Sequence, residues 1–321
     1  MSSDQRLEQK RQGLQQQYDL VAEKLNRLRF DYAIVTDVLI RFEREKQIEQ
    51  TEGELKELEQ QLYYLEQSVS SERLYQALLK LGYRKQTREF RKFIEVHSTA
   101  AFLIHGSPDY GQRWLLNRLV VQHVPSIITG KIVRIDLSRI SRRSDINALW
   151  RELGGRVDLD RQSTIPEIAD RVYRLWQTQN VLLIFYDVNC LQEAFLNELI
   201  QNFWLPLATK AKEATLQTSQ FKLLMFLVDY DGCSGSWNVP FAESQNSWKL
   251  TEITEFSEAE LTEWLDYEED ALPTKLIDQI DKTIQIILKN SDNGIPELTF
   301  CEICRLSDCN WDEQEEKWLR L

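Results

Sequence analysis

A heptad repeat of apolar residues is the strongest constraint on how this chain of 321 residues folds. Near the N-terminus, the a and d positions of the repeat hold Leu7, Leu14, Tyr18, Val21, Leu25, Leu28 and Tyr32. The repeat is interrupted at residues 33–38, where Thr36 or Asp37 can cap a new helix, and a second series follows at Ile48, Leu55, Leu58, Leu62, Leu65 and Val69. Helices with such seams pack against each other. The sequence therefore predicts an antiparallel coiled-coil hairpin over residues 1–70.

A hairpin of two helices buries little surface, so it gains stability by contacting something else. Tyrosine and arginine, which are common in protein interfaces, alternate along its faces. We expect the hairpin to bind a partner protein or to form a homo-oligomer with its own copy. The alternative is that it serves only as a spacer arm.

A polar stretch, Ser68–Glu72, marks the expected end of the hairpin. Beyond it, Leu74, Ala77, Leu78 and Leu81 have the spacing of one short amphipathic helix that ends at Gly82. We expect linker helices over residues 71–99.

Strand-like and helix-like segments alternate from residue 100 onward, which is typical of a parallel sheet covered on both faces. The expected strands are 101–105, 131–137, 181–187, 222–229 and 248–253, and the expected helices between them are 114–123, 146–153, 165–177 and 193–203. The sequence thus predicts an α/β domain over residues 100–254. The acidic and helical remainder, residues 255–321, is expected to form a small C-terminal helical subdomain.

Composition excludes several classes of protein. No apolar run approaches the roughly 20 residues of a membrane-spanning helix, and no signal peptide is recognisable, so we expect a cytoplasmic protein that has no membrane partner. Five cysteines favour a reducing compartment over a disulfide framework. A net charge of −12 argues against nucleic acid as a partner. Two basic clusters, residues 84–92 and 139–143, are interpreted as solvated faces; a nucleic-acid contact at the first is the alternative.

The segment with the clearest chemical meaning follows the first expected strand. Gly106 and Gly111 have the spacing of the glycines in a P-loop, whose backbone N–H groups and helix N-terminus bind phosphates. A P-loop continues with lysine, which reaches the phosphates, and with serine or threonine, which binds Mg²⁺. Here those positions hold Gln112 and Arg113. Gln112 has no charge and a guanidinium cannot ligate a metal, so we expect no hydrolysis, while Arg113 could still contact a phosphate.

The third expected strand ends in Asp187, where a Walker B strand has its acid. Asp187 could hold a magnesium ion, but the next residue is Val188, where many ATPases have the glutamate that polarises water. The candidate cofactor-binding residues of this degenerate nucleotide pocket are therefore Gly106, Gly111, Gln112, Arg113 and Asp187. We predict no catalytic residue and no resident cofactor.

The arrangement resembles the signal-transduction ATPases with numerous domains (STAND), and in particular their inactive branch in conflict and immune-type systems of bacteria, especially cyanobacteria. The resemblance rests on a P-loop-like segment, a Walker B-like strand, the strand after it and tail motifs: Leu103–Leu119, Val181–Asn189, Lys222–Asp231, Trp248–Ile253, Leu261, Trp264, Gly294–Leu298 and Lys317–Leu319. It implies a P-loop NTPase-like sheet with degenerate Walker motifs, acting as a scaffold for an effector on another chain.

Cys301, Cys304 and Cys309 have a spacing that could provide thiol ligands for zinc. Three thiols with no histidine nearby do not complete a tetrahedral set, so we predict no metal site. The sequence as a whole favours a non-enzymatic adaptor or scaffold of a signalling or defence-type system that recognises a partner protein. The alternative is a nucleotide-binding switch with weak or atypical binding through Arg113 and Asp187.

Overall fold

The computed structural model describes residues 3–124, 129–139, 144–214, 221–233 and 247–316. The chain divides into two compact units, and each is described by itself. The first unit comprises Met1–Leu78 and Glu268–Thr274, and the second comprises Leu79–Tyr267 and Lys275–Leu321.

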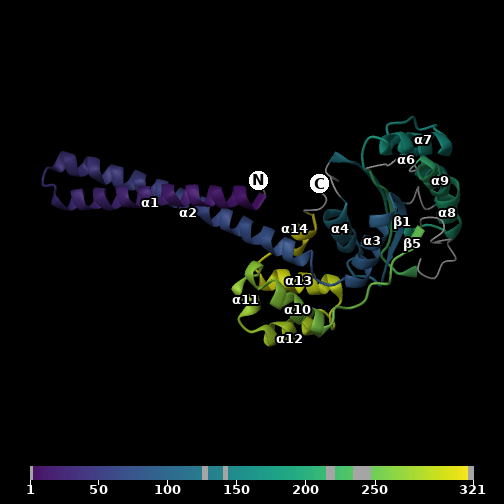
Figure 1. Cartoon of the computed structure of the whole chain (residues 1–321). Coiled ribbons are helices and arrows are strands. Elements are labelled where there is room, and N and C mark those ends of the chain that lie inside the picture. The colour runs from purple at the N-terminus through teal and green to yellow at the C-terminus, as the bar shows by residue number, and fades with distance from the viewer. Residues whose placement is uncertain (1–2, 125–128, 140–143, 215–220, 234–246, 317–321) are drawn as a thin grey trace. The chain divides into compact units, whose positions relative to one another are not determined.

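Two antiparallel helices, α1 (Ser3–Ile34) and α2 (Val38–Leu78), make up most of the first unit (Figure 1). Their contact follows the predicted heptad positions, since the buried or half-buried residues include Leu14, Tyr18, Val21, Leu25, Leu28, Ile48, Leu55, Leu58, Leu62 and Leu65. Polar pairs join the helices beside this seam: the Tyr18 hydroxyl donates to Glu59 at 3.1 Å, and Arg29 pairs with Glu52 at 2.8 Å. The predicted coiled-coil hairpin is present.

Helix α2 does not break where the polar stretch suggested. It runs through Ser68–Glu72 and ends at Leu78. Val69, which continues the seam, is half-buried, and the stretch contains no glycine or proline that would end a helix. The chain turns only at Leu79–Gly82, where Gly82 has a φ of 64°.

A five-stranded parallel sheet forms the centre of the second unit (Figure 1). Its strands are β1 (Thr99–His105), β2 (Lys131–Asp136), β3 (Val181–Tyr186), β4 (Leu223–Asp229) and β5 (Ser247–Lys249). Their order is β2-β3-β4-β1-β5, so β4 lies between the strands that end at the P-loop-like and Walker B-like segments. The five predicted strands are confirmed, with β5 shorter than the expected 248–253.

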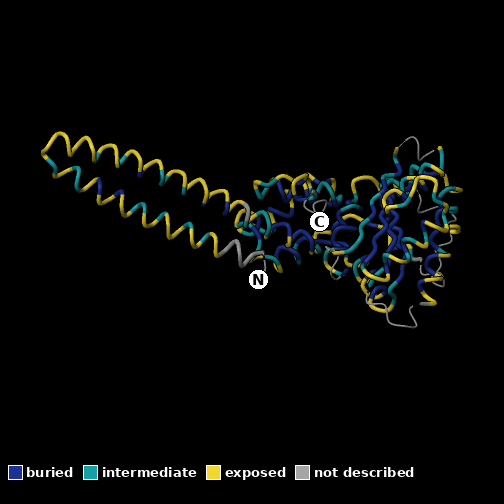
Figure 2. Tube along the Cα trace, turned by 90° about the horizontal axis from the view of Figure 1, so that it is seen from above, coloured by how far each residue is buried: buried dark blue, intermediate teal, exposed yellow. Residues whose placement is uncertain are grey.

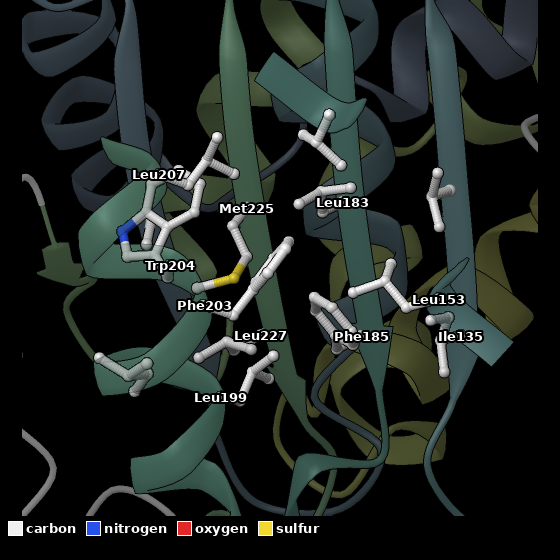
Figure 3. Close-up of a cluster of buried hydrophobic side chains, with 14 of the residues drawn as sticks. Ile135, Leu153, Leu183, Phe185, Leu199, Phe203, Trp204, Leu207, Met225 and Leu227 are labelled. Carbon is white, nitrogen blue, oxygen red and sulfur yellow. The ribbon is translucent and has the colours of Figure 1, made fainter. Parts of the chain in front are cut away.

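Helices cover both faces of the sheet. On one face lie α6 (Ile146–Arg156), α7 (Ile165–Trp176), α8 (Glu193–Glu198), the π-helical turn η3 (Leu199–Trp204) and α9 (Leu205–Ala214). Figure 3 shows side chains of this core, among them Phe185 and Met225 from the sheet and Phe203 from η3. On the other face, α3 (Arg84–Val96) packs Phe90 against Phe102 of β1, with their ring centroids 4.7 Å apart.

The helix expected to end at residue 203 continues through η3 into α9, although Pro206 lies at its junction. Proline cannot donate the N–H that an α-helix interior requires. The wider π-helical turn directly before it changes the hydrogen-bond register, which lets the chain continue past that missing donor.

The C-terminal part of the second unit is helical: α10 (Glu258–Tyr267), most of α11 (Thr274–Ile277), α12 (Ile280–Asn290), α13 (Pro296–Leu306) and α14 (Trp311–Glu316). An aromatic cluster joins these helices to α4 (Gln112–His123). The Phe300 ring stacks on Trp311 at 4.8 Å, and Trp114 of α4 meets Trp311 edge-on at 4.9 Å. The start of α4, which carries the P-loop-like residues, is therefore fixed against the C-terminal helices.

The candidate nucleotide site

The loop between β1 and α4 has the backbone shape that its glycines suggest. Gly111 has a φ of 67° and stands directly before α4, and a Cβ there would lie 2.4 Å from the Tyr83 hydroxyl. That hydroxyl donates to the carbonyl oxygen of Tyr110 at 3.0 Å. The loop is thus held from outside by Tyr83, and glycine at position 111 is required by both the φ angle and the close approach.

Gln112, at the position of the missing lysine, is turned into the loop. Its side chain is buried, and its amide donates to the carbonyl oxygens of Gly106 and Ser107, each at 2.9 Å. A P-loop lysine instead directs its charge at the phosphates of the ligand. In this chain the neutral amide of Gln112 therefore fills the loop, and carbonyl oxygens of the loop itself accept its hydrogen bonds.

Arg113, at the position of the missing serine or threonine, faces a carboxylate of the C-terminal helices. Its guanidinium lies 3.9 Å from Glu315 of α14 and 6.0 Å from the centre of the Tyr186 ring. The Arg113 and Glu315 side chains are 35% and 21% exposed, so each is only partly hydrated. The positive charge that could have met a phosphate is thus paired inside the protein.

More negative charge surrounds the same loop. The N–H of Glu297, in the first turn of α13, donates to the carbonyl oxygen of Asp109 at 3.0 Å. The pKa of Glu297 is raised by burial and further by the charges of Glu315 and Asp109. Burial and the charge of Glu297 likewise raise the pKa of the Cys301 thiol to about 11. A polyphosphate entering here would meet carboxylates of its own sign, which disfavours binding.

Asp187 follows β3 at the same edge of the sheet, with a φ of 57°. The next residue, Val188, is fully buried in the hydrophobic core, so the position of a water-polarising glutamate serves packing instead. Asn189 donates to Asp231 at 2.7 Å. The chain therefore keeps an acid at the Walker B position and has no general base beside it.

Asp229, at the end of β4, is a site residue that the sequence reasoning missed. It is fully buried, and its carboxylate accepts from the N–H groups of Asp231 and Gly232, each at 3.0 Å. This turn lies against the P-loop-like segment, because a Cβ on Gly232 would be 3.0 Å from the carbonyl oxygen of Gly106. The sequence signal that could have identified Asp229 is an acidic residue at the end of an apolar strand, as at Asp187.

Tyr230, which follows Asp229, lies among the candidate residues. Burial raises the pKa of its phenol, as do the neighbouring Tyr186 and Asp187, whereas the charge of Arg113 lowers it. The structure thus places Gly106, Gly111, Gln112, Arg113 and Asp187 at the carboxyl edge of the sheet, where β1 and β3 end.

The remaining candidate sites from the sequence are the C-terminal cysteines and the two basic clusters. Cys301 is exposed whereas Cys304 is buried, and among the residues that the structure describes no three His, Cys, Asp or Glu side chains are placed to hold a metal ion. In the basic cluster on α3, Arg84 pairs with Glu263 at 2.6 Å and Arg91 with Glu95 at 3.6 Å. Residues 140–143 of the second basic cluster, and the tail motif 317–319, lie outside the described residues.

None of the helices in the described parts of the chain combines the length and apolar character that crossing a bilayer requires.

Comparison with known proteins finds a family similarity over part of the chain. The sequence model of the inactive STAND family matches residues 78–228, which confirms the predicted resemblance over that segment. No curated protein matches the chain. Similar solved structures include the Walker-type ATPase PABY2304 of Pyrococcus abyssi, with a TM-score of 0.42 and 12% identity over 75% of this chain and 71% of that one. Another is the Aeropyrum pernix ORC1 protein in complex with DNA, with a TM-score of 0.38 and 10% identity over 77% and 68% of the two chains.

Proposed function

We propose, from the premise that residues 78–228 match the inactive STAND family, that this protein is a non-enzymatic adaptor of a bacterial signalling or defence-type system. In this role the α/β unit recognises a partner protein, and the hairpin recruits a further chain. The single observation that carries the proposal is the position of Gln112, whose amide is bound to Gly106 and Ser107 inside the loop that would otherwise receive phosphate.

The charges around the P-loop-like segment also support a non-enzymatic role. A nucleotide site compensates several negative charges with lysine and Mg²⁺. Here the cation nearest the loop, Arg113, is paired with Glu315, and Glu297 and Asp109 add further negative charge. Chemistry on a bound triphosphate would need groups that this chain does not have at those positions, whereas a rigid surface for protein binding needs none of them.

The first test measures nucleotide binding and turnover. The full-length chain is titrated with millimolar ATP and GTP, with and without Mg²⁺, by isothermal calorimetry, and phosphate release is followed in parallel. We expect neither heat of binding nor turnover above background. Mg²⁺-dependent binding that disappears in Asp187→Ala would instead favour the alternative, a nucleotide-binding switch that uses Arg113 and Asp187.

The second test addresses the adaptor role. The tagged chain is expressed in its native cells, and proteins that co-purify in stoichiometric amounts are identified and then reconstituted from purified components. We expect a defined complex whose assembly does not change when nucleotide is added or removed. A full-length chain that forms no complex with any co-purified protein after reconstitution would contradict the adaptor role.

A further inference from the structure

The hairpin end carries an unusual concentration of exposed apolar side chains. Among the described residues, twelve large hydrophobic side chains are exposed, and half of them lie between residues 30 and 42: Phe30, Ile34, Val38, Leu39, Ile40 and Phe42. Their exposed fractions run from 45% for Ile40 to 79% for Val38. In Figure 2 the connection between α1 and α2 is mostly coloured as exposed. We call these six residues the tip patch. Exposed apolar side chains that are concentrated in one short segment are typical of an interaction site in soluble proteins.

The fold of the hairpin does not require the tip patch. Asp37 closes the turn, because its carboxylate accepts from the N–H groups of Leu39 at 2.9 Å and Ile40 at 3.3 Å and so caps α2. The seam between the helices uses other residues near the turn, such as Val35 and Ile48, which are half-buried. Polar residues at the tip-patch positions would satisfy the turn and the seam equally well, so the apolar residues there call for a covering surface.

The charges around the tip patch indicate what covers it. Within residues 31–46, seven charged side chains make no ion pair in the described structure: Asp31, Asp37, Glu43 and Glu45, and Arg41, Arg44 and Lys46. The cations rest on nearby rings or amides instead, with Arg41 over the Tyr32 ring and Lys46 over the Phe42 ring, each at 4.9 Å. Four carboxylates and three cations without ion pairs, around an apolar centre, make a surface on which each cation can meet a carboxylate of a second copy.

We propose that the tip patch binds the tip patch of a second copy of this chain, in a two-fold symmetric contact. A two-fold interface brings the same surface of each copy together, so each unpaired Arg or Lys of one tip can meet a carboxylate of the other. Two chains of net charge −12 repel each other over most of their surface, and a patch that is close to neutral is where they approach at least cost. The same net charge disfavours an anionic lipid surface as the occupant. This inference rests on the proposed function, since it specifies one chain that the hairpin recruits.

Sedimentation velocity and light scattering on the full-length chain test the proposal. We expect a concentration-dependent species of twice the 38.0 kDa mass. Leu39→Glu adds a charge to the patch in both copies and should weaken self-association by about tenfold or more. The matched control is Leu20→Glu, on the shaft of the hairpin, where the leucine is 67% exposed compared with 77% for Leu39. It should dimerise like the wild type, and far-ultraviolet circular dichroism should show equal helicity in all three proteins.

Photocrosslinking then locates the contact. A benzoylphenylalanine at position 38 is activated in a mixture of isotopically light and heavy chains, and mass spectrometry should find light–heavy crosslinks within residues 30–46. A wild-type chain that stays monomeric, a dimer that Leu39→Glu leaves intact, or crosslinks elsewhere would each overturn the proposal. So would a monomer that sediments with vesicles of phosphatidylcholine and phosphatidylglycerol, because the occupant would then be lipid.

The outcomes separate this inference from the adaptor role itself. A monomeric chain that still binds its protein partner and no nucleotide would refute only the tip contact. A tip-dependent dimer that hydrolyses ATP would refute only the adaptor role.

Discussion

The side-chain amide of Gln112 donates a hydrogen bond to the carbonyl oxygen of Gly106 at 2.9 Å. The bond crosses the loop in which a P-loop would bind a nucleotide phosphate. The substitution of lysine by glutamine therefore does more than remove a charge. It closes the loop with a neutral group, and the C-terminal helices complete the closure when Glu315 pairs with Arg113.

This closure makes repair of the P-loop motif insufficient. We expect Gln112→Lys with Arg113→Thr to leave ATP binding undetectable, because Glu297 and Glu315 still place negative charge beside the loop. Adding Glu297→Gln and Glu315→Gln should then make ATP binding detectable, because both carboxylate charges beside the loop are removed. Titration with a fluorescent ATP analogue measures both. Tight binding by the double variant alone would show that the carboxylates do not block the site.

The Tyr83 hydroxyl also holds the loop between β1 and α4 in place. It donates to the carbonyl oxygen of Tyr110 at 3.0 Å, and the ring packs edge-on against Phe256 at 5.2 Å. Tyr83→Phe keeps the ring contact and removes the hydrogen bond, so the free energy of unfolding should fall by about 1 kcal/mol. Tyr267→Phe, at a residue that is 80% exposed, is the control and should have no effect. Equal stability of the two variants in urea would remove the assigned role of the hydroxyl.

Periodicity in the sequence was enough to predict the two regular parts of the fold. The heptad leucines predicted the hairpin, because apolar spacing directly reports which helix face is buried. The five strands were recognisable for the same reason, since a strand covered on both faces is apolar throughout. The end of α2 was predicted wrongly at Ser68–Glu72, because a run of polar residues inside a helix looks like a boundary although it does not break the backbone hydrogen bonds.

The candidate site was only partly predictable. The positions of Gly106, Gly111 and Asp187 followed from motif spacing. The inward turn of Gln112 did not, because motif spacing does not decide whether a side chain at that position points into its own loop or toward a ligand. The approach of Glu315 to Arg113 did not either, because it depends on how the C-terminal helices pack on α4. Asp229 could have been found, since it ends an apolar strand as Asp187 does.

The half-buried carboxyl of Glu297 gives the protein a pH dependence of defined sign. Its pKa is above the ordinary value of 4.5, mainly because of burial. The folded state therefore binds this proton more tightly than the unfolded state, and the stability it contributes is lost as the pH rises from about 4.5 through the raised pKa. Glu297→Gln should raise the Tm at pH 7 by about 2 °C and should have little effect at pH 4. Calorimetric scans at both pH values measure this. A variant that is less stable than the wild type at pH 7 would contradict the assigned effect of the buried charge.

Gly294 joins the C-terminal helices to the segment after β5. Its φ is 102°, and a Cβ there would lie 2.1 Å from the carbonyl oxygen of Phe256, while its own carbonyl accepts from the Phe256 N–H at 2.8 Å. Neither backbone segment can move away without breaking that hydrogen bond, so Gly294→Ala should cost at least about 3 kcal/mol.

Gly155 in α6 is the matched control in the same unit, because a Cβ there would meet nothing within 4 Å. Gly155→Ala should raise stability by about 0.5 kcal/mol, since alanine loses less backbone entropy than glycine when a helix forms. Urea unfolding followed by tryptophan fluorescence compares the two variants with the wild type. If Gly294→Ala were as stable as Gly155→Ala, the backbone contact between Gly294 and Phe256 would not hold the C-terminal helices in place, and the closure of the nucleotide site by Glu297 and Glu315 would lose its structural basis.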